Sequence, residues 1–273
     1  MRAKEALAKG LKRTAATLLR PIGHLPAHRT NPAMLQAFLA TLHPIDGGYP
    51  LMRLGPARDG GYLVPNDLEG VGACLSAGVG SDSGFELDCA SRGMDVFLTD
   101  ASVAGPAAPH ERFHFQRLHL GAAATPGAIT LDEWAHRTVG DRTDDLLLKI
   151  DIECAEYEVL ITTSADTVAR ARIVVIEFHE LQRLFIDAAF PFLRAAFERL
   201  TATHACVHIH PNNCCGEFSD GGVTLPRNAE FTFLRRDRVR SSTAVTSFPH
   251  TLDADCTTRP GLVLPASLFS GRR

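Results

Sequence analysis

Leu146-Leu-Leu-Lys-Ile-Asp-Ile-Glu-Cys-Ala-Glu-Tyr-Glu-Val-Leu160 is the stretch that decides the fold. Its apolar first half is typical of a buried strand. Alternate side chains of an extended strand lie on the same face, so Lys149, Asp151 and Glu153 are expected to share one face. Charges buried in a sheet must be paired or used. A structural ion pair would explain Lys149 and one carboxylate, but not three acids within six residues.

Short apolar runs alternate with helical stretches from about residue 51 onward. This alternation predicts a mostly parallel, seven-stranded α/β sheet with helices on both faces. The last two strands, joined by a Gly- and Pro-containing loop over 211–227, are expected to form an antiparallel hairpin at one edge. Strands are predicted near Ala73–Ala77, Asp95–Thr99, Phe113–His119, Leu146–Ile152, Ile173–Phe178, Ala205–His210 and Ala229–Leu234, and helices near Phe85–Arg92, Ala155–Leu160 and Pro191–Leu200.

The composition is that of a globular protein in a reducing compartment. The chain has 273 residues, of which 45% are hydrophobic and 22% charged. Its seven cysteines form no CxxC pair, which argues against a disulfide framework and against a zinc knuckle, and favours a cytoplasmic location. No apolar run reaches the roughly 18 residues of a membrane-spanning helix. The sequence predicts a protein that is not embedded in a membrane.

The positive charge is concentrated at the N-terminus. Residues 1–30 carry seven Lys or Arg against Glu5 alone, whereas the rest of the chain is acidic, so we expect no nucleic-acid partner for the main body. Leu7, Leu11 and Leu18 recur at helical spacing before Pro21 and predict a short basic amphipathic helix. Two interpretations stay open, a peripheral contact with an anionic membrane and a solvated helix. We predict a helical extension over 1–48 and one domain over 49–273.

A glycine-containing loop, Ala77-Gly-Val-Gly-Ser-Asp-Ser-Gly84, follows the first predicted strand of the sheet. Such a loop lets a ligand approach main-chain N–H groups at a helix N-terminus, although a plain strand-to-helix turn is the alternative. Asp100 ends the next strand, where an acid binds ribose hydroxyls. The third glycine comes four residues after the second, whereas the dinucleotide fingerprint requires three, which disfavours NAD. The candidate cofactor-binding residues are Gly78, Gly80, Ser81, Asp82, Phe85, Asp100 and Asp151.

The sequence resembles the FkbM-type S-adenosylmethionine-dependent methyltransferases over about residues 52–236. The resemblance implies a class I methyltransferase (Rossmann-like) fold, S-adenosylmethionine as cofactor, and methyl transfer, commonly to a hydroxyl of a sugar, glycan or natural product. The family usually has glycine at the position of Cys154. The matching motifs are Asp59-Gly-Gly-Tyr62, Ser76-Ala-Gly-Val-Gly-Ser-Asp-Ser-Gly-Phe-Glu86, Leu148-Lys-Ile-Asp-Ile-Glu-Cys-Ala-Glu156, Glu177-Phe-His-Glu180, His208-Ile-His-Pro-Asn-Asn213 and Glu230-Phe-Thr.

Ionisable residues gather at the predicted carboxyl ends of the strands, where ligands bind in open α/β sheets. Methyl transfer from a sulfonium requires positioning and a general base, and histidine suits the base because its pKa of ~6.5 lies near the working pH. We predict that His179 or His208, expected on adjacent strands, is the base and that Asp151 orients the base or the acceptor. The predicted acceptor-binding residues are Asp59, Tyr62, Glu153, Glu177, His210, Asn212 and Asn213.

Simpler roles remain open for several of these residues. Any one of the histidines could be a hydrogen-bonded structural residue, and the segments 59–62 and 212–213 could be turns. A divalent metal bound by Asp151, Glu177, His179, His208 and His210 is an option that the sequence does not favour, because it does not fix their distances. The rival functions are a nucleotide-dependent oxidoreductase and a non-catalytic cofactor-binding module. The sequence does not predict the oligomeric state.

Overall fold

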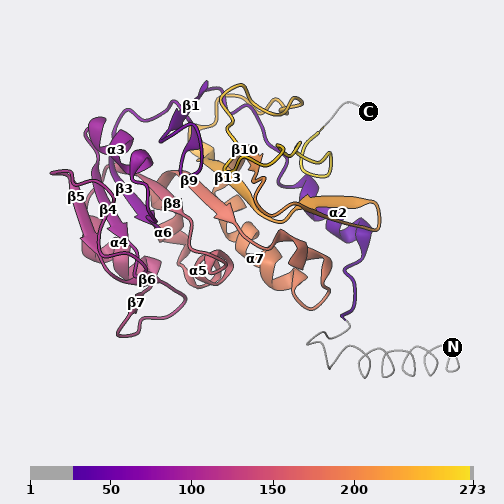
Figure 1. The fold of residues 1–273 in the computed structure, drawn as a ribbon, viewed down its shortest axis with the longest axis horizontal. Helices are drawn as coiled ribbons and strands as arrows, with labels where there is room; N and C mark the ends of the chain where they lie inside the picture. Colours follow the sequence, from indigo (N-terminus) through magenta and orange to yellow (C-terminus); the bar gives the residue numbers. More distant parts are fainter. Residues whose placement is uncertain (1–26, 271–273) are drawn as a thin grey trace, which may run out of the picture.

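A seven-stranded sheet forms the centre of the structure, a computed structural model that describes residues 27–270 (Figure 1). Six strands run in the same direction, and β13 runs antiparallel to both of its neighbours, β9 and β10. The predicted α/β sheet with a C-terminal antiparallel pair is therefore confirmed. In spatial order the strands are β10 (His204–Pro211), β13 (Ala229–Arg235), β9 (Ala171–Phe178), β8 (Asp145–Ile150), β3 (Val71–Ala77), β4 (Asp95–Thr99) and β5 (Phe113–Gln116).

The direction of winding reverses at β3. The chain passes from β3 outward to β4 and β5, and then returns to the other side of β3 through β8 and β9. The carboxyl ends of β3 and β8 therefore diverge into loops that leave the sheet in opposite directions. In open α/β sheets this switch point is where ligands bind. The glycine loop after β3 and Asp151 after β8 meet at this point.

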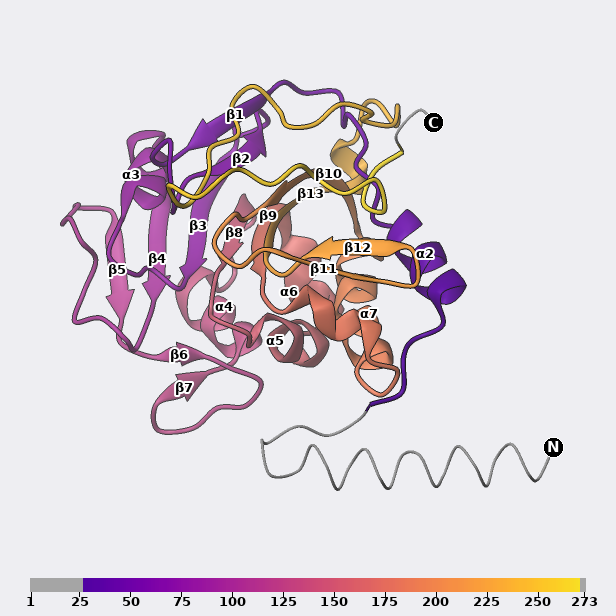
Figure 2. The same cartoon turned by 45° about the vertical axis from the view of Figure 1, so that its right-hand side comes forward.

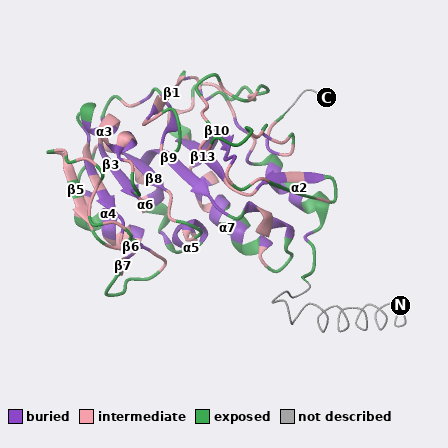
Figure 3. Ribbon diagram, viewed as in Figure 1, coloured by how far each residue is buried: buried purple, intermediate pink, exposed green. Residues whose placement is uncertain are grey.

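Helices and a small hairpin cover the two faces of the sheet (Figure 2). One hydrophobic cluster joins Leu75, Leu148 and Ile176 of the sheet to five helices, and a second cluster joins Cys74 and Val175 to α3 and the hairpin β1–β2. The central strands β3, β8 and β9 are accordingly buried on both faces, as Figure 3 shows in purple, whereas the edge strand β5 is only partly buried. The five helices are α2 (Pro32–Ala40), α4 (Leu131–Val139), α5 (Glu156–Thr162), α6 (Ala165–Arg170) and α7 (Phe190–Thr201); opposite lie α3 (Gly84–Ser91), β1 (Leu51–Leu54) and β2 (Tyr62–Pro65).

Strand β8 ends at Ile150, so the prediction that the strand reaches Ile152 is wrong in its last two residues. The cause is the turn that follows, in which Glu153 and Cys154 have φ angles of 53° and 77°. Such angles break an extended backbone and favour glycine, which is the residue that the FkbM family usually has in place of Cys154. Glu153 therefore does not continue the strand face that begins with Lys149, and its side chain is 86% exposed.

The antiparallel strand β13 lies between β9 and β10. The expectation that His179 and His208 follow adjacent strands is therefore wrong. The loop between β10 and β13 contains a further hairpin, β11 (Glu217–Asp220) with β12 (Val223–Pro226), which lies beside α2 in both ribbon views (Figures 1 and 2). An ion pair of 2.5 Å between Arg29 and Asp220 links this hairpin to the segment before α2. The remaining short elements are β6 (His119–Leu120), β7 (Ala128–Ile129), η2 (Leu181–Phe185) and η3 (Arg236–Arg238).

The segment before residue 48 contributes to the core of the domain. Leu35, Phe38 and Leu39 of α2 and the following Leu42 are buried in the cluster that also contains α7. The basic amphipathic helix predicted around Leu7–Leu18 lies outside the described residues. Within the described residues, no helix combines the length and the apolar character that crossing a bilayer requires.

The pH dependence of stability is expected to include a contribution from His204, the first residue of β10. Its ring is fully buried, with Nε2 2.8 Å from the carbonyl oxygen of Ala171, and burial lowers its pKa from 6.5 to about 4. Below pH 6.5 the unfolded chain therefore binds a proton at His204, whereas the folded chain does not. The contribution of the neutral His204 ring to the free energy of unfolding is complete above pH 6.5 and is lost as the pH falls toward 4. Between pH 7 and pH 5 this loss is about 2 kcal/mol.

Urea unfolding of the wild type and of His204→Gln at pH 7 and pH 5 measures this contribution. The variant should lose about 2 kcal/mol less than the wild type over this interval, whereas His136→Gln, at an exposed position of α4, should lose as much as the wild type. An equal loss in the wild type and His204→Gln would show that the buried ring does not titrate in this way.

Candidate active site

The glycine loop is built around a close contact between two backbones. Gly78 follows β3 with a φ angle of 80°, and a Cβ at this position would lie 1.6 Å from the carbonyl oxygen of Asp151. Gly78 donates its N–H to the carbonyl oxygen of Thr99 (3.0 Å) and accepts a hydrogen bond from Nζ of Lys149. Only glycine allows the ends of β3 and β8 to meet at this distance, so Gly78 fixes the position of Asp151 relative to the loop.

Asp100 holds the far side of the same loop. One carboxylate oxygen accepts hydrogen bonds from the N–H groups of Val79 (2.9 Å) and Gly80 (3.0 Å), and the other from the N–H and Oγ of Ser102. Burial opposes ionisation, but these hydrogen bonds outweigh it and hold the pKa of Asp100 below its usual value. The carboxylate is therefore ionised and orients the loop, while its predicted contact with a ribose stays a prediction.

A pocket of about 250 Å³ opens over this loop, and we call it the glycine-loop pocket. It contains the predicted cofactor-binding residues except Phe85, which is buried against the ring of Tyr62. Its lining is acidic, with Lys149 as the single lysine or arginine among the described residues that form it. The lining residues are Asp59, Gly60, Gly78, Val79, Gly80, Ser81, Asp82, Glu86, Asp100, Ser102, Lys149, Asp151 and Glu153.

A second pocket of about 280 Å³ adjoins the first, and we call it the histidine pocket. The two pockets share Asp59, Asp151 and Glu153, so a ligand in one lies next to a ligand in the other. None of the described residues that line the histidine pocket has an aliphatic or aromatic hydrocarbon side chain. The complete lining is Asp59, Asp151, Glu153, Glu177, His179, Asn212, Cys214, Cys215, Asn228, Cys256 and Thr257.

Asp151 lies at the boundary of the two pockets and is held on one side. The hydroxyl of Tyr62 donates to its Oδ2 (2.8 Å), and Nζ of Lys149 lies 3.9 Å from the same atom. Tyr62 itself lines neither pocket, so its predicted part in acceptor binding becomes a contact with Asp151 in this structure. These two contacts leave Oδ1 of Asp151 without a partner among the described side chains.

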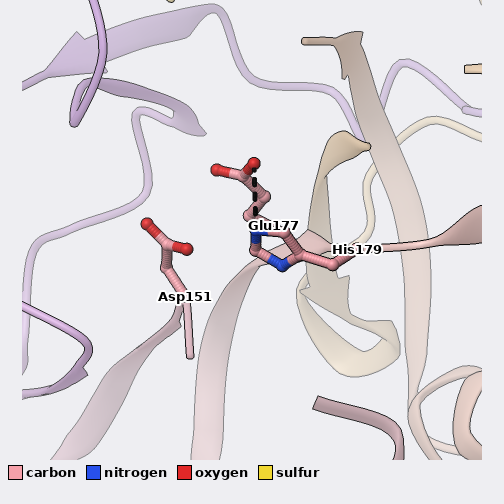
Figure 4. Close-up of side chains that lie close together, drawn as sticks. All are labelled: Asp151, Glu177 and His179. Carbon is pink, nitrogen blue, oxygen red and sulfur yellow. Dashed lines mark ion pairs between the residues drawn. The ribbon is translucent and has the colours of Figure 1, made fainter. Parts of the chain in front are cut away.

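Asp151, Glu177 and His179 converge at the end of β8 and β9, as Figure 4 shows. One ligand atom of each residue lies within 4.8 Å of the others, and we call this group the carboxylate–histidine cluster. Nε2 of His179 is 3.4 Å from Oε1 of Glu177. On the other side of the ring, Nδ1 lies 2.8 Å from Oε1 of Glu156, which is fully buried at the start of α5. A carboxylate can only accept, so Nδ1 carries the proton that is donated to Glu156.

The surroundings shift the pKa of both buried members of the cluster. Burial, assisted by the charge of Asp151, raises the pKa of Glu177 to about 8. Burial alone would lower the pKa of His179, but the hydrogen bond to Glu156 and the charges of Glu177 and Asp151 raise it to about 9. Strongly shifted groups that converge in a pocket are typical of functional sites.

The two asparagines predicted to bind the acceptor have different surroundings. Asn212 donates from Nδ2 to Oε1 of Glu177 (2.6 Å) and lines the histidine pocket. Asn213 faces the C-terminal segment: its Nδ2 donates to the carbonyl oxygens of Thr257 and Arg259, and its Oδ1 accepts from the N–H of Thr257. Asn213 therefore holds the segment that brings Cys256 and Thr257 into the wall of the histidine pocket.

The other two predicted histidines lie apart from this site. Nε2 of His208 is 2.8 Å from Oδ1 of Asp253, and the residue lines a different pocket, with Tyr49 and Phe248. His210 lines a third pocket, also beside Asp253. The structure therefore brings His179, and neither of the other two, to the boundary with the glycine-loop pocket.

Sequence reasoning missed the residues that support or surround the cluster. Glu156 belongs to the 148–156 motif. It was not predicted as a site residue, because its position at the start of a helix is enough to explain a glutamate. Cys214, Cys215 and Cys256 come from loops remote in sequence, and no spacing rule connects them to β9. For Glu156, the signal was available in the motif itself, because an ion pair with Lys149 leaves its third acid unexplained.

The switch point between β3 and β8, the glycine loop and the inserted β13 define a class I, Rossmann-like methyltransferase fold. The sequence profile of the methyltransferase FkbM domain matches residues 63–203, just over half of the chain. The chain therefore belongs to the FkbM family of S-adenosylmethionine-dependent methyltransferases. No curated protein matches it in sequence.

Two solved structures resemble this one at low identity. An rRNA methylase from Streptococcus thermophilus is 8% identical, with a TM-score of 0.34 over 76% of this chain and 97% of that chain. The 1,6-didemethyltoxoflavin-N1-methyltransferase of Burkholderia thailandensis, solved with 1,6-didemethyltoxoflavin and S-adenosylhomocysteine, is 15% identical, with a TM-score of 0.33 over 86% of this chain and 89% of that chain.

Proposed function

We propose that the protein transfers the methyl group of S-adenosylmethionine to a hydroxyl oxygen of a sugar, a glycan or a related natural product. The observation that carries this proposal is the meeting of two pockets at Asp151. The glycine-loop pocket would hold the cofactor and the histidine pocket the acceptor. Their shared wall is where an in-line transfer between two bound molecules has to occur.

The charge of the glycine-loop pocket supports S-adenosylmethionine over a dinucleotide. The cofactor carries a sulfonium and an ammonium against one carboxylate, so its net charge is positive. The acidic lining, with Lys149 as its single lysine or arginine, complements that charge. A pyrophosphate would lie against the same carboxylates unpaired, which disfavours the alternative of a nucleotide-dependent oxidoreductase.

The lining of the histidine pocket supports a polar, hydroxylated acceptor. Its carboxylates, amides and hydroxyl offer many hydrogen-bond partners, and the absence of hydrocarbon side chains from its described lining disfavours a lipid or a flat aromatic ring. Its acidic residues would also repel a phosphate backbone, which disfavours a nucleic acid as the acceptor.

The reaction places specific demands on the boundary between the pockets. The methyl carbon leaves the sulfonium sulfur as a bond forms to the acceptor oxygen, the sulfur becomes a neutral thioether, and the hydroxyl proton has to be removed. The carboxylate–histidine cluster lies on this boundary and provides groups that can orient the hydroxyl and assist loss of its proton.

The cofactor assignment is tested by Gly80→Leu. No atom lies within 4 Å of a Cβ built at Gly80, so the new side chain would extend into the glycine-loop pocket and compete with the cofactor. We expect calorimetry to show at least a tenfold loss of affinity for S-adenosylmethionine. Transfer of labelled methyl groups to a panel of sugars and polyhydroxylated compounds should fall in parallel at limiting cofactor.

Gly93→Leu is the matched control. Gly93 also has a positive φ angle and open space around its Cβ, but it precedes β4 at the opposite end of the strand from Asp100. The two variants therefore share the backbone strain of a left-handed residue. Wild-type affinity in Gly80→Leu, or an equal loss in both variants, would show that the cofactor does not occupy this pocket.

A further inference from the structure

We infer that the carboxylate–histidine cluster binds one divalent cation, Mn²⁺ or Mg²⁺, through Asp151, Glu177 and His179. The cation would lie at the boundary of the two pockets, within reach of the acceptor hydroxyl. Its role in activating that hydroxyl rests on the proposed function, whereas the binding site itself rests on the geometry of the cluster.

The first argument is the orientation of the His179 ring. The ring is buried, and Nδ1 donates its proton to the buried carboxylate of Glu156 at 2.8 Å. In the neutral ring, which forms when a cation displaces the second proton, this fixes the tautomer in which the lone pair is on Nε2. Within residues 27–270 the structure records no hydrogen bond to Nε2, which faces Glu177 Oε1 at 3.4 Å and Glu153 Oε2 at 3.5 Å. Histidines that ligate metals are oriented in the same way, by a carboxylate on the opposite nitrogen.

The second argument is that a hydrogen bond to one oxygen already orients each carboxylate. Tyr62 donates to Oδ2 of Asp151 at 2.8 Å, and Asn212 donates to Oε1 of Glu177 at 2.6 Å. Each carboxylate therefore keeps its other oxygen for a further partner. Ligands that are already oriented in this way lose little freedom when an ion binds.

The third argument is charge. Asp59 and Glu153 line both pockets beside Asp151 and Glu177, and Lys149 is the only lysine or arginine among the described residues lining either pocket. Nζ of Lys149 approaches Asp151 at 3.9 Å and donates to the carbonyl oxygen of Gly78. Buried carboxylates are costly unless they are paired or coordinate a metal. A doubly charged cation would balance Asp151 and Glu177.

The spacing of the ligand atoms suits a small octahedral ion. Around a cation with bonds of about 2.1 Å, neighbouring ligands lie about 3 Å apart and opposite ligands about 4.2 Å apart. The three ligand atoms lie within 4.8 Å of one another, so small side-chain rotations suffice to close the site. Two carboxylates with one imidazole are compatible with Mn²⁺ and Mg²⁺, and three coordination positions would remain open.

An acceptor hydroxyl at an open position would be oriented and made more acidic by the ion. Its proton would pass to the carboxylate of Glu153, whose exposed side chain lies at the mouth of both pockets and can release it to water. The methyl carbon then forms its bond to the oxygen as the carbon–sulfur bond breaks. The charges balance, because the proton lost by the hydroxyl replaces the positive charge that the sulfonium gives up.

Titration of the full-length protein with Mn²⁺, followed by the electron paramagnetic resonance signal of the free ion, tests the site without any acceptor. We expect one Mn²⁺ per chain and competition by Mg²⁺. Glu177→Gln and His179→Ala should each weaken Mn²⁺ binding at least tenfold. Glu156 lies on the Nδ1 side of the His179 ring, away from the cation, and also accepts from the N–H of Cys154. Glu156→Gln should weaken Mn²⁺ binding about 10- to 100-fold.

Glu230→Gln is the matched control. Glu230 is a buried carboxylate on β13 directly opposite Glu177, but it does not belong to the cluster. Its replacement should leave Mn²⁺ affinity within about twofold of the wild-type value. Circular dichroism and thermal unfolding of every variant check that the fold is retained.

The outcomes separate this inference from the proposed function. Absence of specific Mn²⁺ binding to the wild type, or unchanged affinity in both Glu177→Gln and His179→Ala, overturns the cation site. Methyl transfer that persists in EDTA would then leave the proposed function standing, with the cluster acting directly on the hydroxyl. Specific Mn²⁺ binding that depends on Glu177 and His179 supports the site, even if no hydroxylated acceptor is methylated and the proposed function fails.

Discussion

His179→Ala is expected to lower the turnover number for methyl transfer by about 10²- to 10⁴-fold while the affinity for S-adenosylmethionine stays near its wild-type value. Nε2 of His179 faces Glu177 on the acceptor side, and His179 does not line the glycine-loop pocket. Its loss removes a group that assists loss of the acceptor proton, whether Nε2 acts directly or through a bound ion. Steady-state kinetics and calorimetry of cofactor binding measure the two quantities separately.

His136→Ala, on the exposed surface of α4, is the control and should turn over normally. The variant Asp151→Asn provides a contrast, because Asp151 lines both pockets and its replacement should affect cofactor affinity as well as turnover. A His179→Ala protein that is folded and retains wild-type turnover would remove His179 from the reaction.

Gly78→Ala is expected to lower the free energy of unfolding by about 3 kcal/mol or more. The φ angle of 80° strains any side-chain-bearing residue, and the new Cβ would lie 1.6 Å from the carbonyl oxygen of Asp151, so the backbones of the two loops would have to separate. Because this contact positions Asp151, cofactor binding and turnover should fall together. Urea unfolding monitored by tryptophan fluorescence measures the loss of stability.

Gly80→Ala measures the strain of a positive φ angle without the clash between a new Cβ and the carbonyl oxygen of Asp151. Gly80 also has a positive φ angle, 59°, but no atom lies within 4 Å of its Cβ. Its replacement should cost only about 1 kcal/mol, the lower end of the range for a left-handed residue. Similar losses in Gly78→Ala and Gly80→Ala would show that the loop separates from Asp151 easily and does not fix its position.

Much of the fold could be predicted from the sequence because buried parallel strands leave a clear apolar pattern. The strands β3, β4, β8 and β9 were all located, and the last two strands were correctly expected to pair. The insertion of β13 beside β9 could not be foreseen, because strand order depends on contacts between segments remote in sequence. The end of β8 was misplaced because Glu153 and Cys154 adopt a backbone conformation that their residue types disfavour.

The candidate site was predicted in part for the same reasons. Asp151, Glu177 and His179 lie at the carboxyl ends of two neighbouring parallel strands, so the rule for carboxyl ends predicted that they come together. His208 satisfied the same rule in sequence, but its strand lies at the edge of the sheet and its ring pairs with Asp253, a residue from the C-terminal segment that no periodicity connects to it. Strand order decides which histidine lies next to Asp151, and local sequence patterns do not reveal strand order.

The contacts of Asn213 with the C-terminal segment join the histidine pocket to a part of the chain that lies beyond the matched family domain. The matched family domain ends at residue 203, yet Asn212, Asn228 and Thr257 line the histidine pocket beyond that limit. The side of the site that would receive the methyl donor thus lies largely within the inherited domain. The histidine pocket adds residues from later segments, and Asn213 anchors the segment that contains Thr257. A change in the C-terminal segment would therefore alter one wall of the histidine pocket and leave the lining of the glycine-loop pocket unchanged.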